Sequence, residues 1–444
     1  MGEPAMKNDN HQDVLQSRKR INPKKHNPNV ATFLSILFAG LGQMYNRRFG
    51  KGILFFIIEA AFLISFYDFL NIGLWGLFTL GEIPKIDHSI FLLVQGLVSV
   101  ILISFAIVLY YFNVVDARRE AKRLQAGEKL PTLVESVKNT WDNSFPYILI
   151  TPGLVLLIFI VILPLLFMVS LAFTDYNLYN SPPRNLLNWV GFENFKNLAS
   201  VPIWQNTFIS VFSWTIVWTV VATTSQIALG LFLALLVNDP RIKFKRFIRT
   251  ILILPWAVPA FVTILVFAAM FNDKFGAINR DILSQFGVMI PWLTDPFWAK
   301  VALILIQTWL GFPFVFALFT GVLQSISKDW YEAADIDGAS RFQKFRHITL
   351  PHVLYATAPL LIMQYAGNFN NFNIIYLFND GGPAVRGQNA GGTDILISWV
   401  YDLIFTTNNY NMAAAITIII GLLVTGFAIF QFRRTRSFKE EGNI

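Results

Sequence analysis

The feature that most constrains this chain is a series of apolar segments, each long enough to cross a lipid bilayer as a helix. Such a helix needs about 20 mainly apolar residues to cross the hydrocarbon core. The segment must be helical because the core offers no water to free backbone groups. The composition of the 444 residues, 55% hydrophobic and 14% charged, agrees with this interpretation. We therefore predict an all-α polytopic membrane protein with about eight spans, at 52–70, 89–113, 147–173, 207–237, 249–271, 298–323, 353–378 and 412–432.

The N-terminal 51 residues differ from the rest in being polar and basic. They contain one short apolar segment, Val30 to Tyr45, with basic residues on both sides. Because this segment is too short to span comfortably, we interpret it as interfacial or re-entrant on the cytoplasmic side. A ninth span is the alternative. The first 29 residues lack the apolar centre of a signal peptide, and we expect a disordered cytoplasmic tail.

The Lys and Arg residues are distributed unevenly between the two sides of the predicted membrane. With eight spans and both termini inside, 28 of the 35 basic residues fall on the cytoplasmic side. Cytoplasmic loops of membrane proteins carry this excess. The pattern predicts a multi-pass protein with cytoplasmic N- and C-termini, and it attributes the net charge of +8 to topology rather than to nucleic-acid binding.

A strongly polar stretch at 329–351 separates the sixth and seventh predicted spans and lies on the cytoplasmic side. Local signals predict two short helices within it, held as a rigid knob between two spans. These signals are a capping box at Asp329 and Glu332, a stop at Gly338, a second box at Ser340 and Gln343, and a break at Leu350 and Pro351, where Pro351 starts the next span.

This stretch resembles the EAA loop of membrane subunits of bacterial ABC importers. The family pattern of Glu-Ala-Ala, a following Gly and Ile-x-Leu-Pro is present at 332–334, 338 and 348–351. In that family the loop forms a coupling helix that sits in a groove of a separate ATP-hydrolysing subunit. The resemblance implies ATPase-coupling roles for Glu332, Ala333, Ala334, Asp337, Gly338, Ile348, Leu350 and Pro351. Whether Glu332 caps its own helix or contacts the ATPase stays open.

Six spans with this loop between the fourth and fifth resemble the core of a type I importer permease, and two preceding spans resemble the MalF-type subunit of maltodextrin importers. Some MalF-type proteins carry a large external domain where this chain has only residues 174–206. The predicted organisation is a tail with the short apolar segment (1–51), an N-terminal hairpin (52–113), a cytoplasmic linker (114–146), a permease domain (147–432) with the loop 329–351, and a tail (433–444).

Neutral polar residues mark a candidate solute path through the two spans beside the loop. Gln364, Asn368 and Asn371 are spaced to share one helix face, and Gln307, Gly311 and Phe314 repeat that spacing. Amides suit sugar hydroxyls because they both donate and accept hydrogen bonds. They also hold helices together in membranes, and this alternative stays open. MalF-type subunits bind sugar at matching positions, which implies substrate-binding roles for Gln307, Leu310, Gly311, Phe314, Gln364, Asn368 and Asn371.

Several function classes lack their sequence signatures. The chain has no Cys, no GxxxxGK[ST] pattern and no HExxH, so we expect neither metal nor ATP binding by this chain. The six core spans carry no charged residue beyond their ends, which disfavours an ion-coupled secondary transporter. Glu59, in the first span, is the exception, and we expect it to snorkel or to have a partner. The external sequence Gly381-Gly382-Pro383 is either a binding-protein docking site or a simple surface loop.

The leading hypothesis is a non-catalytic permease subunit of a bacterial cell-membrane importer for maltose or maltodextrins. The resemblance implies an ATP-binding subunit dimer that holds ATP and Mg²⁺, a second MalG-like permease in a heterodimer, an extracellular sugar-binding protein and an oligosaccharide substrate. A homodimer, a different oligosaccharide, a secondary transporter and a membrane-embedded transferase are the alternatives.

Overall fold

The computed structural model of the protein describes residues 26–128 and 130–434, and its regular structure is helical. Two isolated β-bridges are the only β pairing within those described ranges. Contacts divide the chain into two compact units, one of residues 1–168 with 180–188 and one of residues 169–179 with 189–444. The prediction of an all-α polytopic protein is confirmed. The predicted tails lie mostly outside the described residues.

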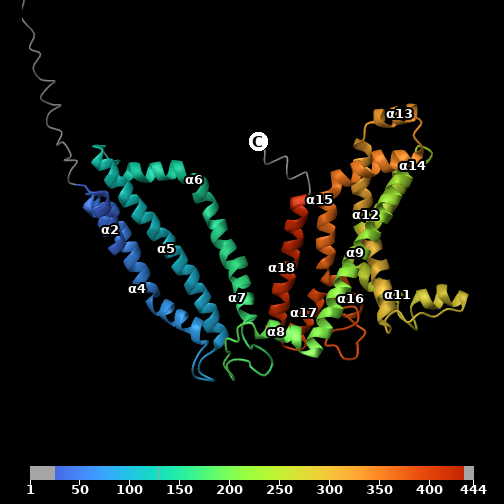
Figure 1. The fold of residues 1–444 in the computed structure, drawn as a ribbon, viewed down its shortest axis with the longest axis horizontal. Helices are drawn as coiled ribbons and strands as arrows, with labels where there is room; N and C mark the ends of the chain where they lie inside the picture. Colours follow the sequence, from blue (N-terminus) through green and yellow to red (C-terminus); the bar gives the residue numbers. More distant parts are fainter. Residues whose placement is uncertain (1–25, 129, 435–444) are drawn as a thin grey trace, which may run out of the picture. The chain divides into compact units, whose positions relative to one another are not determined.

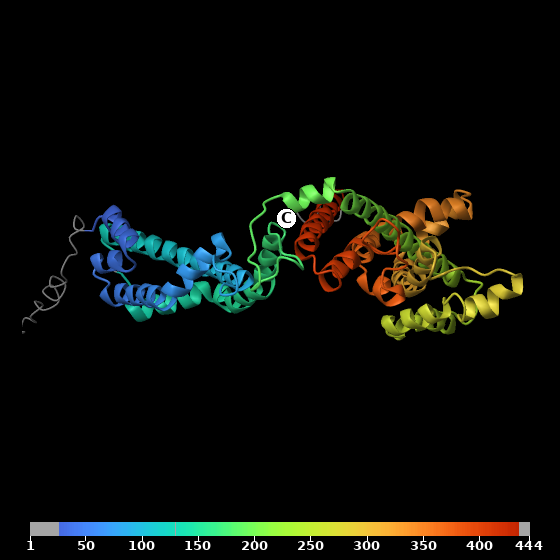
Figure 2. The same ribbon diagram turned by 90° about the horizontal axis from the view of Figure 1, so that it is seen from below.

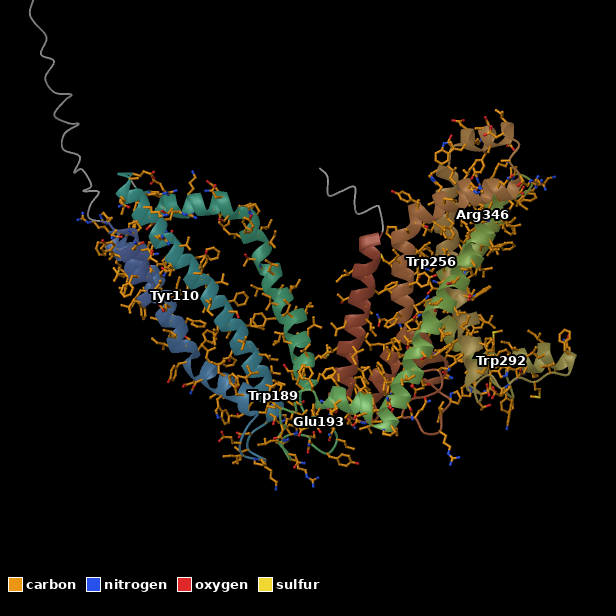
Figure 3. All side chains as sticks on the ribbon, in the orientation of Figure 1. Tyr110, Trp189, Glu193, Trp256, Trp292 and Arg346 are labelled. Carbon is orange, nitrogen blue, oxygen red and sulfur yellow. The ribbon has the colours of Figure 1, made fainter. Side chains whose placement is uncertain are left out.

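Six helices of the described chain are long and apolar enough to cross a membrane, and a bent helix pair adds a seventh. Predicted span 249–271 is this pair, Lys245–Ala257 and Ala260–Met270, with an 88° bend between them. Trp256, labelled in Figure 3, lies at the bend beside the prolines that break the helix. Predicted span 353–378 is not one helix, because it is interrupted after Phe369.

In the first unit, α4 (Phe49–Thr79) and α5 (Ser89–Gln125) form a hairpin and lie side by side in Figures 1 and 2. Small residues bring the two backbones close, since a Cβ on Gly73 would overlap the Ser99 hydroxyl. The Gln95 amide donates a hydrogen bond of 3.0 Å to the carbonyl of Phe69 across the pair. Close packing and interhelical hydrogen bonds therefore hold this hairpin.

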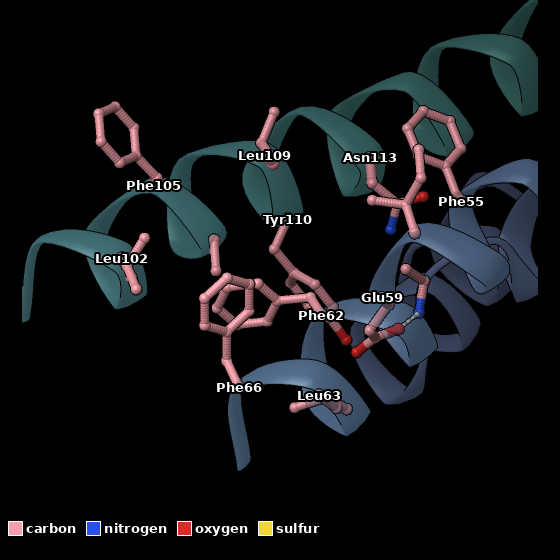
Figure 4. Close-up of a pocket in the computed structure, with 13 residues that line it drawn as sticks. Phe55, Glu59, Phe62, Leu63, Phe66, Leu102, Phe105, Leu109, Tyr110 and Asn113 are labelled. Atoms are coloured by element: carbon pink, nitrogen blue, oxygen red, sulfur yellow. Dashed lines mark hydrogen bonds between the residues drawn. The ribbon is translucent and has the colours of Figure 1, made fainter. Parts of the chain in front are cut away.

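The short apolar segment forms two helices, α2 (Pro28–Leu37) and α3 (Leu41–Tyr45), packed against the hairpin. Neither helix is long enough to span, because ten residues rise only about 15 Å. The segment is thus not a ninth span. The carboxylate of Glu59 accepts a hydrogen bond of 2.7 Å from the Ala39 N–H in the turn between these helices (Figure 4). Of the two predicted roles, snorkelling or pairing, Glu59 has the second.

A partly buried ionic cluster joins α4 to α5 beside the same segment, which has its own hydrogen bond to α5. Lys51 Nζ lies 2.6 Å from Asp116 Oδ1 and 3.0 Å from Glu120 Oε1. The Gln43 side chain donates to the Asn113 carbonyl at 3.0 Å. Because Gln43 is fully buried, these groups position the short helices against α5.

The third predicted span is a near-continuous helix made of α6 (Leu133–Leu157), a π-helical turn (Ile158–Ile162) and α7 (Leu163–Leu171). A capping box of Thr132 and Glu135 starts α6. Much of the predicted linker 114–146 is therefore helical. The boundary between the two compact units falls at residue 168, within α7. The predicted boundary at 146, between linker and permease domain, stays a prediction.

The second unit is organised around two long helices, α9 (Pro202–Asn238) and α12 (Pro296–Ser325). They approach closely at Gly230, where an added Cβ would lie 2.9 Å from the Val315 side chain. Trp218, Phe316 and Phe319 are fully buried in this unit. The other α-helices around this pair, apart from the polar loop and the seventh span, are α8 (Glu193–Ser200), α10 (Lys245–Ile253), α11 (Ala260–Met270), α17 (Leu396–Phe405) and α18 (Tyr410–Arg434).

Candidate functional site

The polar loop forms a short helix, α13 (Lys328–Ile336), whose N-cap is Ser327. The Ser327 hydroxyl accepts a hydrogen bond of 3.3 Å from the Asp329 N–H. The predicted Asp329–Glu332 capping box is therefore wrong. Ser327 takes the cap because its backbone is extended, whereas Asp329 already lies in the first turn, where its charge favours the helix dipole. Glu332 is exposed and so is available to a partner protein.

The exit from α13 follows the sequence closely. Gly338 adopts φ 73°, a conformation that favours glycine, and ends the helix as predicted. The second capping box, Ser340 with Gln343, is confirmed. Pro351 lies in the first turn of the next helix, as predicted, where it removes no helical hydrogen bond, and the predicted break is therefore wrong. The chain runs on as α14 (Arg341–Lys344), a π-helical turn (Phe345–Thr349) and α15 (Leu350–Phe369).

One groove of about 570 Å³ gathers much of the predicted coupling set. Five of the eight predicted residues line it, namely Ala333, Ala334, Asp337, Ile348 and Pro351. Glu332, Gly338 and Leu350 do not. Sequence reasoning missed two bulky apolar residues of α13, Trp330 and Ile336, which are 51% and 87% exposed. An apolar side chain exposed on a polar loop is the signal that could have found them.

The rigidity of this knob comes from contacts between α13 and the segment that follows it. The Tyr331 hydroxyl lies 2.9 Å from the Thr349 hydroxyl, and Lys344 pairs with Asp335. In Figure 1, α13 and α14 lie at one end of the second unit, and Figure 3 labels Arg346 on the same segment. These contacts connect α13 to the segment that leads into α15.

Within the helices, the predicted amides belong to one hydrogen-bond network. Gln307 Nε2 donates to Gln226 Oε1 at 3.2 Å, and Gln226 Nε2 donates to Gln364 Oε1 at 3.3 Å. Asn371 Nδ2 donates to Gln307 Oε1 at 3.1 Å and lies 3.4 Å from Asn368 Oδ1. Sequence reasoning missed Gln226, a fully buried amide of α9 at the centre of the network.

The network continues into α9 through Asn368, which donates to the Thr223 hydroxyl at 2.8 Å. The Trp218 ring N–H donates to the Asn368 carbonyl at 2.9 Å. Asn368 is therefore buried and engaged, whereas Asn371 and Gln364 are half-buried. Gln226 is a polar residue inside an apolar span, the fourth in the prediction. That position is the signal that could have identified it as part of the network.

Three predicted path residues have other surroundings. Gly311 lies against the Gln226 amide, because a Cβ there would overlap the amide oxygen, and glycine is needed to admit that amide. Leu310 packs against the apolar core, and the Phe314 ring lies 5.9 Å from the Trp256 ring. The structure thus brings Gln307, Gln364, Asn368 and Asn371 together and leaves Leu310 and Phe314 outside their hydrogen-bond network.

The prediction that Gln364, Asn368 and Asn371 share one helix is wrong. Helix α15 ends at Phe369, and Asn371 is the N-cap of α16 (Phe372–Asn379). The apolar run continues across this break, so periodicity does not reveal it. Irregular backbone at membrane depth is tolerated where it is buried in protein or lines a polar cavity, and here the amide network lies beside it.

The external loop after α16 is built on internal contacts. Gly381 has φ 74°, and a side chain there would overlap the Asp394 carboxylate. That carboxylate accepts hydrogen bonds of 2.7 Å from the Ser398 hydroxyl and from the Gly391 N–H. Burial raises the pKa of Asp394 to about 6, and these hydrogen bonds partly oppose the rise. Gly381 is thus explained by the loop's own packing, and binding-protein docking there stays a prediction.

The described residues form a polytopic membrane fold, and a network of amides connects helices within its second unit. The family model described as "Binding-protein-dependent transport system inner membrane component" matches residues 226–437. The chain is 54% identical to the galactooligosaccharides transport system permease protein GanP of Bacillus subtilis, over 93% of this chain and 99% of that one. It therefore belongs to the family of permease proteins of binding-protein-dependent transport systems.

Two further comparisons support the same family and fold. The maltodextrin transport system permease protein MalC of Streptococcus pneumoniae is 46% identical over 95% of this chain and 99% of its own. A bacterial ABC transporter involved in alginate import matches the fold, with a TM-score of 0.56 and 22% identity over 69% of this chain and 98% of that one. The predictions of a multi-pass ABC importer permease and of a non-catalytic subunit are confirmed by these relatives.

Proposed function

We propose that this chain forms half of the translocation path for a neutral oligosaccharide in an ATP-driven, binding-protein-dependent importer. The observation that carries the proposal is the amide network at the break between α15 and α16. Its half-buried members, Asn371 and Gln364, offer both donors and acceptors, which suit the hydroxyls of a sugar. The absence of charge along the core spans suits an uncharged solute.

The partners follow from the geometry of the loop and the names of the relatives. Helix α13 presents an apolar and small-residue surface, Trp330, Ala333 and Ile336, which suits insertion into a groove of an ATP-binding subunit. That subunit, as a dimer, would hold ATP and Mg²⁺, and this chain would hold no cofactor. A second permease subunit completes the path, and an extracellular binding protein delivers the sugar. Both termini face the cytoplasm, as the basic residues indicate.

Two sugar classes compete for the substrate. The relative at 54% identity is named for galacto-oligosaccharides, and relatives at 46% and 45% are named for maltodextrin. The higher identity favours galacto-oligosaccharides as the first candidate. Maltodextrin, the substrate class predicted from the sequence, is the second. Competition by unlabelled sugars of both series against uptake of a labelled sugar separates them.

The test of the path is Asn371→Leu in the assembled transporter. The substitution keeps similar bulk and removes a donor and an acceptor, which costs about 1–3 kcal/mol, or roughly tenfold to a hundredfold in sugar affinity. Uptake per assembled complex should fall while binding-protein-stimulated ATP hydrolysis persists. The matched control is Gln95→Leu, which removes the interhelical hydrogen bond of the first unit. It should lower yield and leave uptake per complex unchanged. If Asn371→Leu also lowers yield and leaves uptake per complex unchanged, the amide network only holds the helices together and does not bind sugar.

A further inference from the structure

A polar cavity lies in the second unit, outside the amide network. It measures about 200 Å³ and is enclosed by α16, α17 and the external loop between them. In Figure 1 α17 lies toward the end of this unit opposite to α13, which is the external side in the predicted topology. Sites for drug-sized ligands measure about 300–1,000 Å³, so this cavity suits a smaller group such as one sugar ring.

One wall of the cavity is aromatic. Tyr376 stacks on Phe372 with ring centroids 5.1 Å apart, and Tyr401 lies 5.2 Å from Tyr376 and 4.6 Å from Phe405. Phe405, at the end of this series of rings, is 68% exposed. A connected series of rings with an exposed end offers a flat apolar platform, against which the C–H face of a sugar ring can pack.

Carboxylates also line the cavity. Asp394 uses one oxygen for Ser398 and the other for Gly391, so it serves the fold of the loop. Asp380 and Asp402 also line the cavity, and neither has an ion pair among the described residues. Carboxylates accept hydrogen bonds from hydroxyls, and the lining has no basic residue, which disfavours an anionic ligand. No group suited to a metal ion is present in the described chain.

The cavity and the amide network lie at the two ends of one helix. Helix α16 starts directly after Asn371 and ends at Asn379, next to Asp380. Its eight residues rise about 12 Å. A single sugar ring does not cover that distance, whereas a short oligosaccharide does.

We propose that this cavity is an outer glycosyl subsite, in which Tyr401 and Phe405 carry a neutral sugar ring and Asp402 accepts its hydroxyls, while the other end of the same oligosaccharide occupies the amide network at Asn371. The inference rests on the proposed function and adds a length preference to it. A tetrasaccharide engages both sites, and a disaccharide engages one. The aromatic wall therefore favours longer oligosaccharides over shorter ones.

The experiment measures uptake by the complete transporter from mixtures of a labelled disaccharide and a labelled tetrasaccharide, at concentrations that saturate the binding protein. Maltose with maltotetraose and galactobiose with galactotetraose are both used. Tyr401→Leu removes the ring and keeps bulk, and Phe405→Leu does so at an exposed position with little risk to folding. Each should lower the tetrasaccharide-to-disaccharide uptake ratio by up to about tenfold, the range of one aromatic contact.

The control is Tyr410→Leu, which removes one ring of the Tyr176–Tyr410 stack outside the cavity and should leave the ratio unchanged. If Tyr401→Leu does not assemble, Phe405→Leu decides. An unchanged tetrasaccharide-to-disaccharide uptake ratio in a well-assembled Phe405→Leu transporter overturns the outer subsite, whether or not total uptake falls. If the wild-type transporter takes up neither sugar series, the proposed function itself is overturned. That outcome differs from failure of the outer subsite, in which the wild-type transporter takes up sugar.

Discussion

A methyl group added at Gly311 should break the centre of the amide network. In Gly311→Ala the new Cβ overlaps Gln226 Oε1, so the buried Gln226 amide must rotate away. Two hydrogen bonds are then lost, from Gln307 at 3.2 Å and to Gln364 at 3.3 Å. Each leaves a buried or half-buried polar group without its partner, at a cost of about 1–3 kcal/mol. The gain from replacing a helical glycine by alanine, about 0.5–1 kcal/mol, offsets only part of this.

The assay is the thermal unfolding midpoint of the purified chain in detergent, measured beside Gly321→Ala. Gly321 lies in the same helix with no atom near its Cβ position, so its substitution should be neutral or slightly stabilising. In a double-mutant cycle, Gln226→Ala should abolish the penalty of Gly311→Ala, since the overlapping amide is then gone. If Gly311→Ala is as stable as Gly321→Ala, the position assigned to the Gln226 amide is refuted.

Three further predictions concern other parts of the chain. Ala334→Asp places a charge in the α13 groove, so uptake and ATPase association should be lost while the chain still inserts into the membrane. Retained uptake would contradict the coupling role. The raised pKa of Asp394, about 6 against an ordinary 3.8, means that the folded chain binds this proton more tightly. The unfolding free energy should therefore fall by up to about 3 kcal/mol as pH rises from about 4 to 6, and Asp394→Asn should flatten a thermal-midpoint profile over that range. Glu59→Gln weakens the contact with the Ala39 N–H, so proteolysis near residue 39 should accelerate, and an unchanged rate would contradict it.

Sequence reasoning succeeds here where a signal is local. Apolar length indicates most of the spans, and the Ser340–Gln343 box and Gly338 appear as predicted. It fails where tertiary contacts decide. The break at Asn371 interrupts no apolar pattern, and the role of Gly311 depends on Gln226, an amide of another helix that no spacing rule connects to it. Ser327 rather than Asp329 caps α13 because the extended backbone ends one residue before Lys328.

The central claim is that ATP hydrolysis on a partner subunit drives an uncharged oligosaccharide past the amide network. The direct measurement is uptake of labelled oligosaccharide into proteoliposomes that contain this chain with its second permease and ATPase, with binding protein outside and ATP enclosed. We expect uptake that requires ATP and binding protein and that continues when ionophores collapse all ion gradients, because the core spans carry no charged residue beyond their ends. Uptake that stops with the gradient while ATP is present, or that proceeds without ATP, would contradict the account.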